Sequence, residues 1–161
     1  MNRNRGFSLV EVIVTVTIIA GLLGLGVATL SGLRQRDSLD RASSLVYDDL
    51  ILIRSKAIAV GKTHRIRWTS ETQWVLEYYD DTLFPASWVQ FSQNRQMPND
   101  IYLMTESFSN AGSNLEATAR GIYQFQNGKT GSPYLTIEGV GVARTKSFYV
   151  YTGGAIEIRT P

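Results

Sequence analysis

The stretch of sequence that decides how this chain is built lies near its N-terminus: residues 6–33 read GFSLVEVIVTVTIIAGLLGLGVATLSGL. Two arginines precede the stretch, and after Glu11 no charged residue follows until Arg34. A helix over residues 12–33, about 22 residues with a rise of about 1.5 Å each, reaches about 33 Å, which matches the hydrocarbon thickness of a bilayer. The sequence therefore predicts a transmembrane helix over residues 7–33.

Glu11 is the one charge between Gly6 and Arg34. A carboxylate inside hydrocarbon costs roughly 2.5 to 3.5 kcal/mol, so a charge at this position needs a partner. The other polar residues of the stretch are serines and threonines, which carry no charge. We therefore expect the partner of Glu11 to come from another molecule or from a chain terminus.

The leader, residues 1–6, differs from a secretory signal peptide. Such a peptide has its small-residue cleavage site after the apolar core, whereas Gly6 stands before the core. Cleavage after Gly6 would create an amino group on Phe7, close to Glu11 in the chain, and neighbouring subunits could pair these opposite charges. The plainer alternative is an uncleaved signal anchor in which Glu11 has no function.

The run from Gly6 to Glu11, followed by a long apolar helix, resembles the class III leader and N-terminus of type IV pilins and type II secretion pseudopilins. The resemblance implies that a prepilin peptidase cuts after Gly6 and methylates the new terminus on Phe7, giving N-methylphenylalanine. It also implies that Glu11 pairs with the terminal amine of a neighbouring subunit during assembly. Basic residues flank both ends of the span, so the positive-inside rule leaves the orientation open. The resemblance implies a single-pass protein of the bacterial inner membrane with its head in the periplasm.

Residues 34–161 form the expected head, which has the size of one modest domain. Arg3 and Arg5 leave with the leader, after which basic and acidic side chains balance in number. A basic isoelectric point therefore does not indicate nucleic-acid binding here. Charge is uneven along the head: residues 34–116 carry 9 Lys and Arg against 11 Asp and Glu, and residues 117–161 carry 5 against 2.

The chain has no cysteine, so no disulfide can stabilise the head, and its core must do so alone. Among the proteins that the N-terminus resembles, major type IV pilins usually close a C-terminal loop with a disulfide. The absence of cysteine therefore favours a pseudopilin or a minor pilin.

Residues 34–60 show the pattern of an amphipathic helix. Apolar residues recur there in steps of three and four, with charged residues between them. Neither proline nor glycine occurs from Leu33 to Val60, and Gly61 offers a C-terminal stop, so we expect one helix that continues from the span. The expected buried stripe is Leu39, Ala42, Val46, Leu50, Ile53, Ala57 and Val60.

Residues 61–161 contain short runs of β-branched and aromatic residues separated by turn residues, which indicates strands. Antiparallel strands packed on the apolar stripe of one helix give an α+β head. Gly153-Gly154 suits a two-residue hairpin turn, and Asp80–Ser87 and Thr105–Arg120 are expected loops. The predicted strands are His64–Trp68, Trp74–Tyr79, Trp88–Phe91, Ile101–Met104, Ile122–Gln126, Tyr134–Ile137, Ser147–Tyr151 and Ala155–Arg159.

Two features of the head extend the resemblance to the GspH/FimT group of minor pseudopilins and minor pilins. One is the segment Arg54-Ser55-Lys56-Ala57-Ile58-Ala59, after which Gly61 enters a strand. The other is a closing Gly-Gly-x-Ile-x-Ile strand that starts at Gly153. The resemblance implies a minor pseudopilin of a type II secretion system, a structural subunit at or near the tip of the periplasmic pseudopilus that aids protein export.

The same resemblance implies a set of protein partners. Other pseudopilins or pilins would bind through the N-terminal helices in a hetero-oligomeric filament. The prepilin peptidase would process the chain, and the inner-membrane assembly platform would add it to the filament. The head would meet the outer-membrane secretin or a secreted substrate.

The alternative is a FimT-like minor type IV pilin that contributes to pilus assembly or DNA uptake. Nucleic-acid contacts would then come from Lys129, Arg144, Lys146 and Arg159, and such phosphate contacts weaken as salt rises. The DNA-binding members carry a C-terminal Gly-Arg-x-Arg element, where this chain has Ile156-Glu157-Ile158-Arg159. A glutamate beside the expected contact argues against DNA binding.

Nothing in the sequence adds up to a catalytic centre, so we expect a structural protein with no cofactor and no metal. His64 is the one histidine, which excludes a histidine-rich metal centre, and its neighbours suggest no Ser-His-Asp arrangement. Glu77, Asp80 and Asp81 could offer oxygen ligands to calcium, but their spacing matches no known calcium loop. Solvated charges at a strand end are the simpler interpretation of these carboxylates.

Overall fold

A computed structural model describes residues 8–99, 101–104, 114–125, 134–139, 145–151 and 153–160. Within these ranges, the side chains of residues 25–32, 35, 104, 125 and 134 are not described. The chain divides into two compact units, Met1–Arg36 and Asp37–Pro161. We call the second unit the head.

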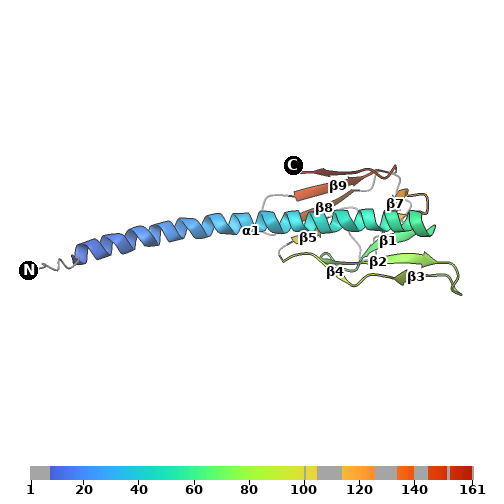
Figure 1. Ribbon diagram of the computed structural model, residues 1–161, viewed down its shortest axis with the longest axis horizontal. Coiled ribbons are helices and arrows are strands. Elements are labelled where there is room, and N and C mark those ends of the chain that lie inside the picture. Colours follow the sequence, from blue (N-terminus) through green and yellow to red (C-terminus); the bar gives the residue numbers. More distant parts are fainter. Residues whose placement is uncertain are drawn as a thin grey trace, which may run out of the picture. The chain divides into compact units, whose positions relative to one another are not determined.

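One long helix, α1 (Leu9–Val60), is the first element of the described chain (Figure 1). It ends where the sequence predicts, because Gly61 takes a left-handed conformation with φ of 71° and its amide donates to the Ala57 carbonyl at 2.9 Å. The prediction of a helix over residues 34–60 is confirmed.

After α1, the described part of the head contains two antiparallel sheets (Figure 1). The first has the strand order β3-β2-β1-β6-β7, with β4 pairing separately with β2, and the second has the order β10-β9-β8-β5. The bounds of the first sheet are β1 His64–Trp68, β2 Gln73–Asp80, β3 Ser87–Gln90, β4 Arg95–Gln96, β6 Asn114–Ala117 and β7 Tyr123–Phe125. Those of the second are β5 Ile101–Met104, β8 Tyr134–Gly139, β9 Thr145–Val150 and β10 Ile156–Arg159.

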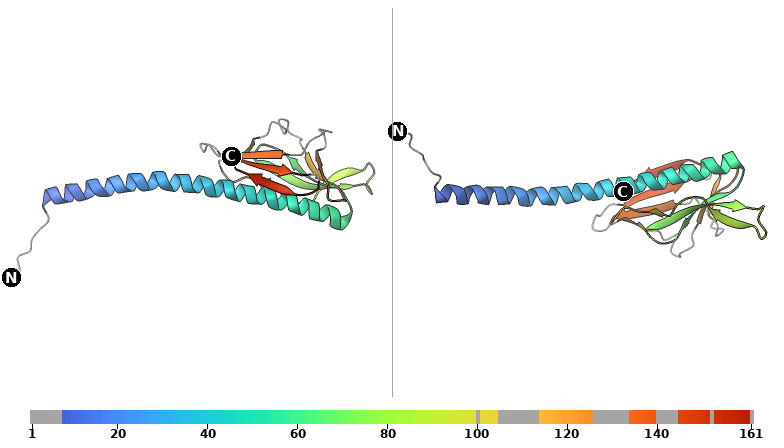
Figure 2. Two further views of the ribbon diagram at one scale, coloured as in Figure 1. Left: turned by 90° about the horizontal axis from the view of Figure 1, so that it is seen from above. Right: turned by 60° about the horizontal axis from the view of Figure 1, so that its bottom comes forward.

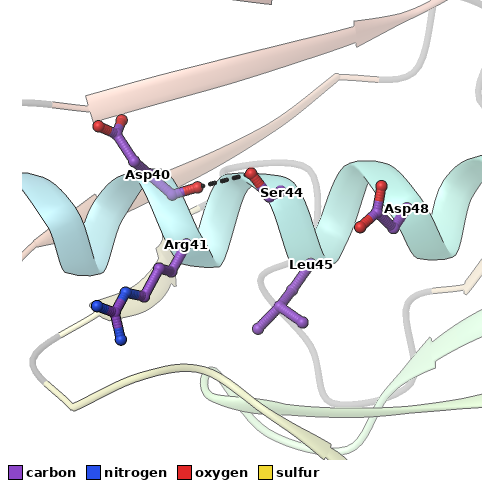
Figure 3. Close-up of a pocket in the computed structure, with 5 residues that line it drawn as sticks. All are labelled: Asp40, Arg41, Ser44, Leu45 and Asp48. Atoms are coloured by element: carbon purple, nitrogen blue, oxygen red, sulfur yellow. Dashed lines mark hydrogen bonds between the residues drawn. The ribbon is translucent and has the colours of Figure 1, made fainter.

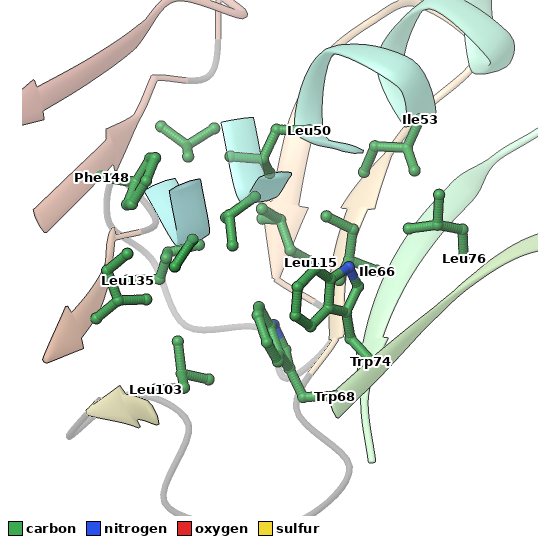
Figure 4. Packing of buried hydrophobic residues seen from close by; sticks show 14 of the residues in the cluster. Leu50, Ile53, Ile66, Trp68, Trp74, Leu76, Leu103, Leu115, Leu135 and Phe148 are labelled. Carbon is green, nitrogen blue, oxygen red and sulfur yellow. The ribbon is translucent and has the colours of Figure 1, made fainter. Parts of the chain in front are cut away.

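The core of the head forms where the apolar stripe of α1 meets both sheets (Figure 4). The stripe residues from Leu39 to Ala57 that the sequence predicts are at most 4% exposed, which confirms them. Val60 was predicted to belong to the same stripe, but it is 57% exposed because it is the last residue of the helix. The sheets supply Ile66, Trp68, Trp74, Leu76, Leu115, Leu103, Leu135, Ile137, Phe148 and Val150.

The α+β prediction is confirmed, but part of one predicted loop is wrong. Residues 114–117, inside the expected loop Thr105–Arg120, form β6, which pairs with β1 along the register from His64↔Ala117 to Arg67↔Asn114. The strand has only four residues and no β-branched side chain, and two of its residues are polar, so the sequence signal for a strand is weak. Residues 105–113 lie outside the described part of the chain.

The other differences concern turns and strand ends. The two-residue strand β4 was not predicted, and β7 starts one residue later than expected. The β9–β10 turn is longer than the predicted two residues, because the Tyr151 amide donates to the Ala155 carbonyl at 2.9 Å and the loop lies between them. Gly154 takes a φ of 90° in this turn, a conformation that favours glycine.

Arg54 connects α1 to two turns that are far away in the sequence. Its Nε donates to the Gly121 carbonyl at 3.0 Å, and its Nη1 and Nη2 donate to the Gly154 and Gly153 carbonyls at 2.9 and 3.1 Å. The turns approach so closely that a Cβ on Gly154 would collide with the Arg54 guanidinium, and one on Gly121 would lie 2.7 Å from Ile58 Cδ1. We call this contact the Arg54 clamp.

Asp49 is a buried carboxylate on the same helix, only 4% exposed. Its Oδ2 accepts a hydrogen bond from Trp74 Nε1 at 2.7 Å, and its Oδ1 lies 3.4 Å from Nη2 of Arg95. Burial raises the pKa of Asp49, and the Trp74 hydrogen bond and the Arg95 charge offset only part of that effect. The helix is therefore tied to β2 by a polar contact inside an apolar core.

Removing the Arg54 clamp should destabilise the head. We expect Arg54→Met to lower the free energy of unfolding by about 2 to 3 kcal/mol, because three carbonyls lose hydrogen bonds to a charged group. Urea denaturation of the full chain in detergent micelles, followed by tryptophan fluorescence, would measure this. Lys56→Met is the matched control, because Lys56 is exposed on the same helix. Equal unfolding midpoints for the two variants would contradict the role of the clamp.

Asp49 should make the stability of the head depend on pH. The native state binds this proton more tightly than the unfolded chain, whose pKa is near 3.8. The contribution of Asp49 to the free energy of unfolding should therefore fall as pH rises from about 3.8 through the native pKa, by up to about 1.4 kcal/mol per pH unit. In Asp49→Asn this dependence is absent, so the variant should gain stability relative to the wild type as pH rises.

The measurement is the difference in unfolding free energy between wild type and Asp49→Asn, taken from about pH 4 to pH 7 because this window begins at the unfolded pKa. Contributions from the other carboxylates cancel in that difference. Glu71→Gln changes an exposed carboxylate in the β1–β2 turn and serves as control. A difference that stays constant with pH, or that changes in the opposite direction, would show that burial does not raise the pKa of Asp49.

Candidate assembly site

The first turn of α1 carries Glu11, the candidate for charge pairing. The helix begins at Leu9, and the Ser8 carbonyl accepts hydrogen bonds from the amides of Glu11 and Val12 at 3.0 and 3.2 Å. Glu11 is exposed, and no basic side chain of the described residues forms an ion pair with it. Gly6 and Phe7, the predicted cleavage and methylation positions, lie outside the described part of the chain.

A capping signal at this helix end was missed in the sequence. Ser8 stands just before the first helical residue and Glu11 stands three residues later, which is the Ser-x-x-Glu spacing of a capping box. A carboxylate in the first turn also interacts favourably with the helix dipole. Glu11 therefore suits the start of the helix as well as a partner from another subunit.

The large apolar side chains between Leu9 and Leu23 have no cover within the described chain. Those ten side chains are between 49% and 78% exposed and occur all around the helix. Thr15 and Thr17 bond back to the carbonyls of Glu11 and Ile13, at 2.6 and 2.8 Å, and so present little polarity to the outside. Such a surface requires an apolar environment, whether lipid or neighbouring helices.

Among the described side chains, α1 contains no stretch that is both long enough and apolar enough to cross a membrane. The predicted span covers residues 7–33, and residue 7 and the side chains of residues 25–32 lie outside the described part.

The side of α1 that faces away from the core forms an open surface on the head (Figure 3). It has a pocket of about 430 Å³ lined by Asp40, Arg41, Ser44, Leu45 and Asp48, where the Ser44 hydroxyl donates to the Asp40 carbonyl at 3.1 Å. A second pocket, of about 310 Å³, shares Asp40 and Asp48 and reaches Tyr47, Lys146 and Ile158. Short polar side chains and a few apolar ones at an open helix face suit a protein contact rather than a reaction.

The four basic residues predicted for nucleic-acid contact do not form one cluster in the described chain. Lys146 Nζ bonds Asp40 Oδ1 at 2.6 Å, and Arg159 bonds both carboxylate oxygens of Glu157 at 2.9 and 3.0 Å. The β9–β10 register places Arg159 opposite Ser147, so Arg159 and Lys146 lie on opposite faces of the second sheet. Lys129 and Arg144 lie outside the described residues.

The three carboxylates considered for calcium are engaged with cations of the protein. Glu77 accepts from Arg65 Nε at 2.7 Å and from Arg67 Nε at 2.9 Å. Burial opposes the ionisation of Glu77, but these arginine hydrogen bonds outweigh it and lower the pKa of the carboxyl. Asp80 and Asp81 lie 2.8 and 3.6 Å from Lys62 Nζ. In the described chain, no three His, Cys, Asp or Glu side chains are grouped to hold a metal.

His64 is buried in the head rather than placed in a site. Its Nδ1 lies 2.9 Å from the Lys62 carbonyl, and its ring packs against Tyr78 and Phe91 with centroids 5.9 and 5.4 Å away. Burial lowers the pKa of His64 and favours the neutral ring. These contacts give the histidine a packing role.

Comparison with known proteins gives two findings and one negative result. Residues 1–28 match the family model described as the prokaryotic N-terminal methylation motif. No curated protein sequence matches the chain. Two structures of the minor pseudopilin EpsH from the type II secretion system of Vibrio cholerae have a similar fold. The first has a TM-score of 0.59 at 14% identity and covers 77% of this chain and 98% of that one.

The second EpsH structure has a TM-score of 0.57 at 11% identity, and the alignment covers 76% of this chain and 96% of the other. At such identity the likeness concerns the fold, an N-terminal helix packed on antiparallel sheets. The motif concerns the other end of the chain, where the run from Gly6 to Glu11 lies. The chain therefore combines the prokaryotic N-terminal methylation motif, in residues 1–28, with a head that has the α+β fold of the minor pseudopilin EpsH.

Proposed function

We propose that this chain is a minor pseudopilin of a type II secretion system, a structural subunit at or near the tip of the periplasmic pseudopilus that aids protein export. One combination of findings carries the proposal. A methylation motif over residues 1–28 precedes a head whose fold covers almost the whole of the EpsH structure. EpsH is a minor pseudopilin of such a system.

The N-terminal segment supports an assembly role. In the proposed mechanism, a prepilin peptidase removes residues 1–6 and methylates the amine of Phe7, and residues 7–33 enter the inner membrane. The uncovered apolar side chains of α1 then pack against lipid and against the helices of other subunits. Glu11 forms no ion pair with a basic side chain of the described residues, and in the filament it binds the terminal amine of a neighbouring subunit.

The head supports a structural role because buried charged side chains in it are paired within the head. Glu77 forms ion pairs with Arg65 and Arg67, and Asp49 forms one with Arg95 and also accepts a hydrogen bond from Trp74. The outer face of α1, with the two pockets that Asp40 and Asp48 line, offers a contact surface. The head then meets other pseudopilins, the secretin or a secreted substrate, and the assembly platform of the inner membrane adds the subunit to the filament.

The alternative role in DNA uptake has less support from the geometry. A phosphate would have to compete with Glu157 for Arg159 and with Asp40 for Lys146. Because these two cations lie on opposite faces of the second sheet, one strand of DNA could not use both side by side. The role of a FimT-like minor type IV pilin is therefore the second candidate.

Replacing Glu11 should separate membrane insertion from assembly. We expect Glu11→Gln to insert normally, since it removes a charge from hydrocarbon, but to enter filaments about tenfold less, the loss expected for about 1.4 kcal/mol of pairing energy. Cysteine crosslinking to a neighbouring pseudopilin in membranes would measure incorporation. Thr15→Val, one turn along the same helix, is the control for helix packing. Wild-type incorporation of Glu11→Gln would refute the pairing.

The proposed role predicts a secretion defect. In a strain that lacks the gene, the amount of secreted enzyme in the culture medium should fall sharply, while the same enzyme accumulates in the periplasm. Restoring the gene should restore secretion. Normal secretion without the gene would remove support for the type II role and favour a minor type IV pilin, for which DNA uptake is the next assay.

A further inference from the structure

The β2–β3 hairpin ends in three consecutive apolar residues, Leu83, Phe84 and Pro85, which we call the apolar tip. Phe84 is fully exposed at 105% of its reference area, Leu83 is 44% exposed, and residues 81–86 are exposed throughout. Hairpin turns are usually polar, because their side chains face water. A single exposed apolar residue needs no explanation, but an aromatic ring at the apex of an apolar turn contributes nothing to folding.

The base of the apolar tip is held in place by hydrogen bonds. Asp80 Oδ1 accepts from Lys62 Nζ at 2.8 Å, from the Thr82 hydroxyl at 2.7 Å and from the Thr82 amide at 3.1 Å. The hydrogen bonds from Lys62 and Thr82 lower the pKa of Asp80 to about 2, so this carboxylate stays charged at neutral pH.

Aromatic packing braces the two strands just below the tip. Tyr79 of β2 pairs with Trp88 of β3, and their rings meet edge to face with centroids 5.4 Å apart. The Arg65 guanidinium lies 3.8 Å from the centroid of the Trp88 ring. Because these contacts hold the base of the hairpin in place, less ordering entropy would be lost when a partner binds the tip than when it binds an unbraced loop.

The apolar tip lies at the end of the head where α1 stops (Figure 2). The Tyr79 amide donates to the Thr63 carbonyl at 2.8 Å, just after the helix, and the Lys62–Asp80 bond lies beside it. The helix enters the head at Asp37 and ends at Val60, so the tip is at the opposite end of the head from Asp37. This end of the head is free to meet another protein.

The charge beside the tip selects the chemistry of its partner. The side chain of Asp81 is 72% exposed and lies 3.6 Å from Lys62 Nζ, and Leu83 and Phe84 follow it in the turn. The single positive charge of Lys62 is set against the two negative charges of Asp80 and Asp81, so the base of the tip has one negative charge in excess. An anionic lipid surface would repel it, whereas a cationic rim would attract it. We propose that the apolar tip inserts Phe84 into an apolar pocket with a basic rim on a partner protein of the cell envelope.

The proposed contact has an arrangement that is common at protein interfaces, where one aromatic side chain is buried at the centre and charged groups surround it. The proposed docking goes beyond the assembly role of the N-terminal helix, because the contact is made by a turn of the head. A strain that secretes normally without the gene would remove the secretion role and leave the docking of the tip unaffected.

A single engineered cysteine can test the docking, because the chain has none of its own. Ala86→Cys places a thiol beside the tip and leaves Phe84 in place, and Ser70→Cys places one in the exposed β1–β2 turn as the matched control. The labelling rate with a small maleimide is measured in intact cells and on the purified full chain in detergent micelles. We expect Ala86→Cys to label about tenfold more slowly in cells than when purified, as for a site occupied about nine-tenths of the time.

Variants of the tip then identify what causes the protection. Adding Phe84→Ala to Ala86→Cys should restore the fast rate, and adding Asp81→Lys should restore it in part, because a cation would meet a basic rim. Phe84 contacts no core residue, so Phe84→Ala should leave the thermal unfolding midpoint of the purified chain unchanged. Protection that persists in Phe84→Ala would overturn the proposal, as would fast labelling of Ala86→Cys in cells.

A third measurement tests whether the tip binds lipid instead of a protein. Vesicles of phosphatidylcholine, with and without phosphatidylglycerol, are added to the purified Ala86→Cys chain. The proposal predicts no protection from either. Vesicle protection that disappears in Phe84→Ala would show that the tip binds lipid, and the partner-protein proposal would be wrong.

Discussion

The head depends on the contact between the apolar stripe of α1 and its two sheets. Residues from Leu39 to Ala57 bury one face of the helix against both sheets, and with no cysteine in the chain this core must provide most of the stability. The polar contacts fix the fit: Asp49 binds Trp74 of the first sheet, and the Arg54 clamp holds the β6–β7 and β9–β10 turns. The helix is thus a common support for strands that are distant in the sequence.

The N-terminal part of the same helix has the opposite property, since its apolar side chains are left without cover. Between Leu9 and Leu23 they are exposed all around, and Glu11 has no described cationic partner. The helix therefore has two segments with different surroundings: the segment in the head is buried against the sheets, and the segment before it is exposed. The core contacts of the head lie within the chain, whereas under the proposed function the exposed apolar side chains of the N-terminal segment are covered by lipid or by other subunits.

The sequence predicted those features that depend on local patterns. Steps of three and four gave the buried stripe, Gly61 gave the end of the helix, and aromatic runs gave most strands, because each pattern reflects burial or backbone geometry nearby. The strand β6 was missed because Asn114 and Glu116 are polar yet buried, and only pairing with β1 on one side and β7 on the other makes them a strand. The roles of Arg54 and Asp49 also depend on distant residues, so no local pattern shows them.

Under the proposed function the N-terminus is processed before the subunit joins a filament, and mass spectrometry of the N-terminal peptide would detect that processing. The protein would be isolated from the membranes of its own host, digested and analysed without an affinity tag at the N-terminus. We expect a peptide that begins with N-methylated Phe7. A peptide that retains Gly6 and the residues before it would show that the leader is not removed, and the proposed assembly role would be wrong.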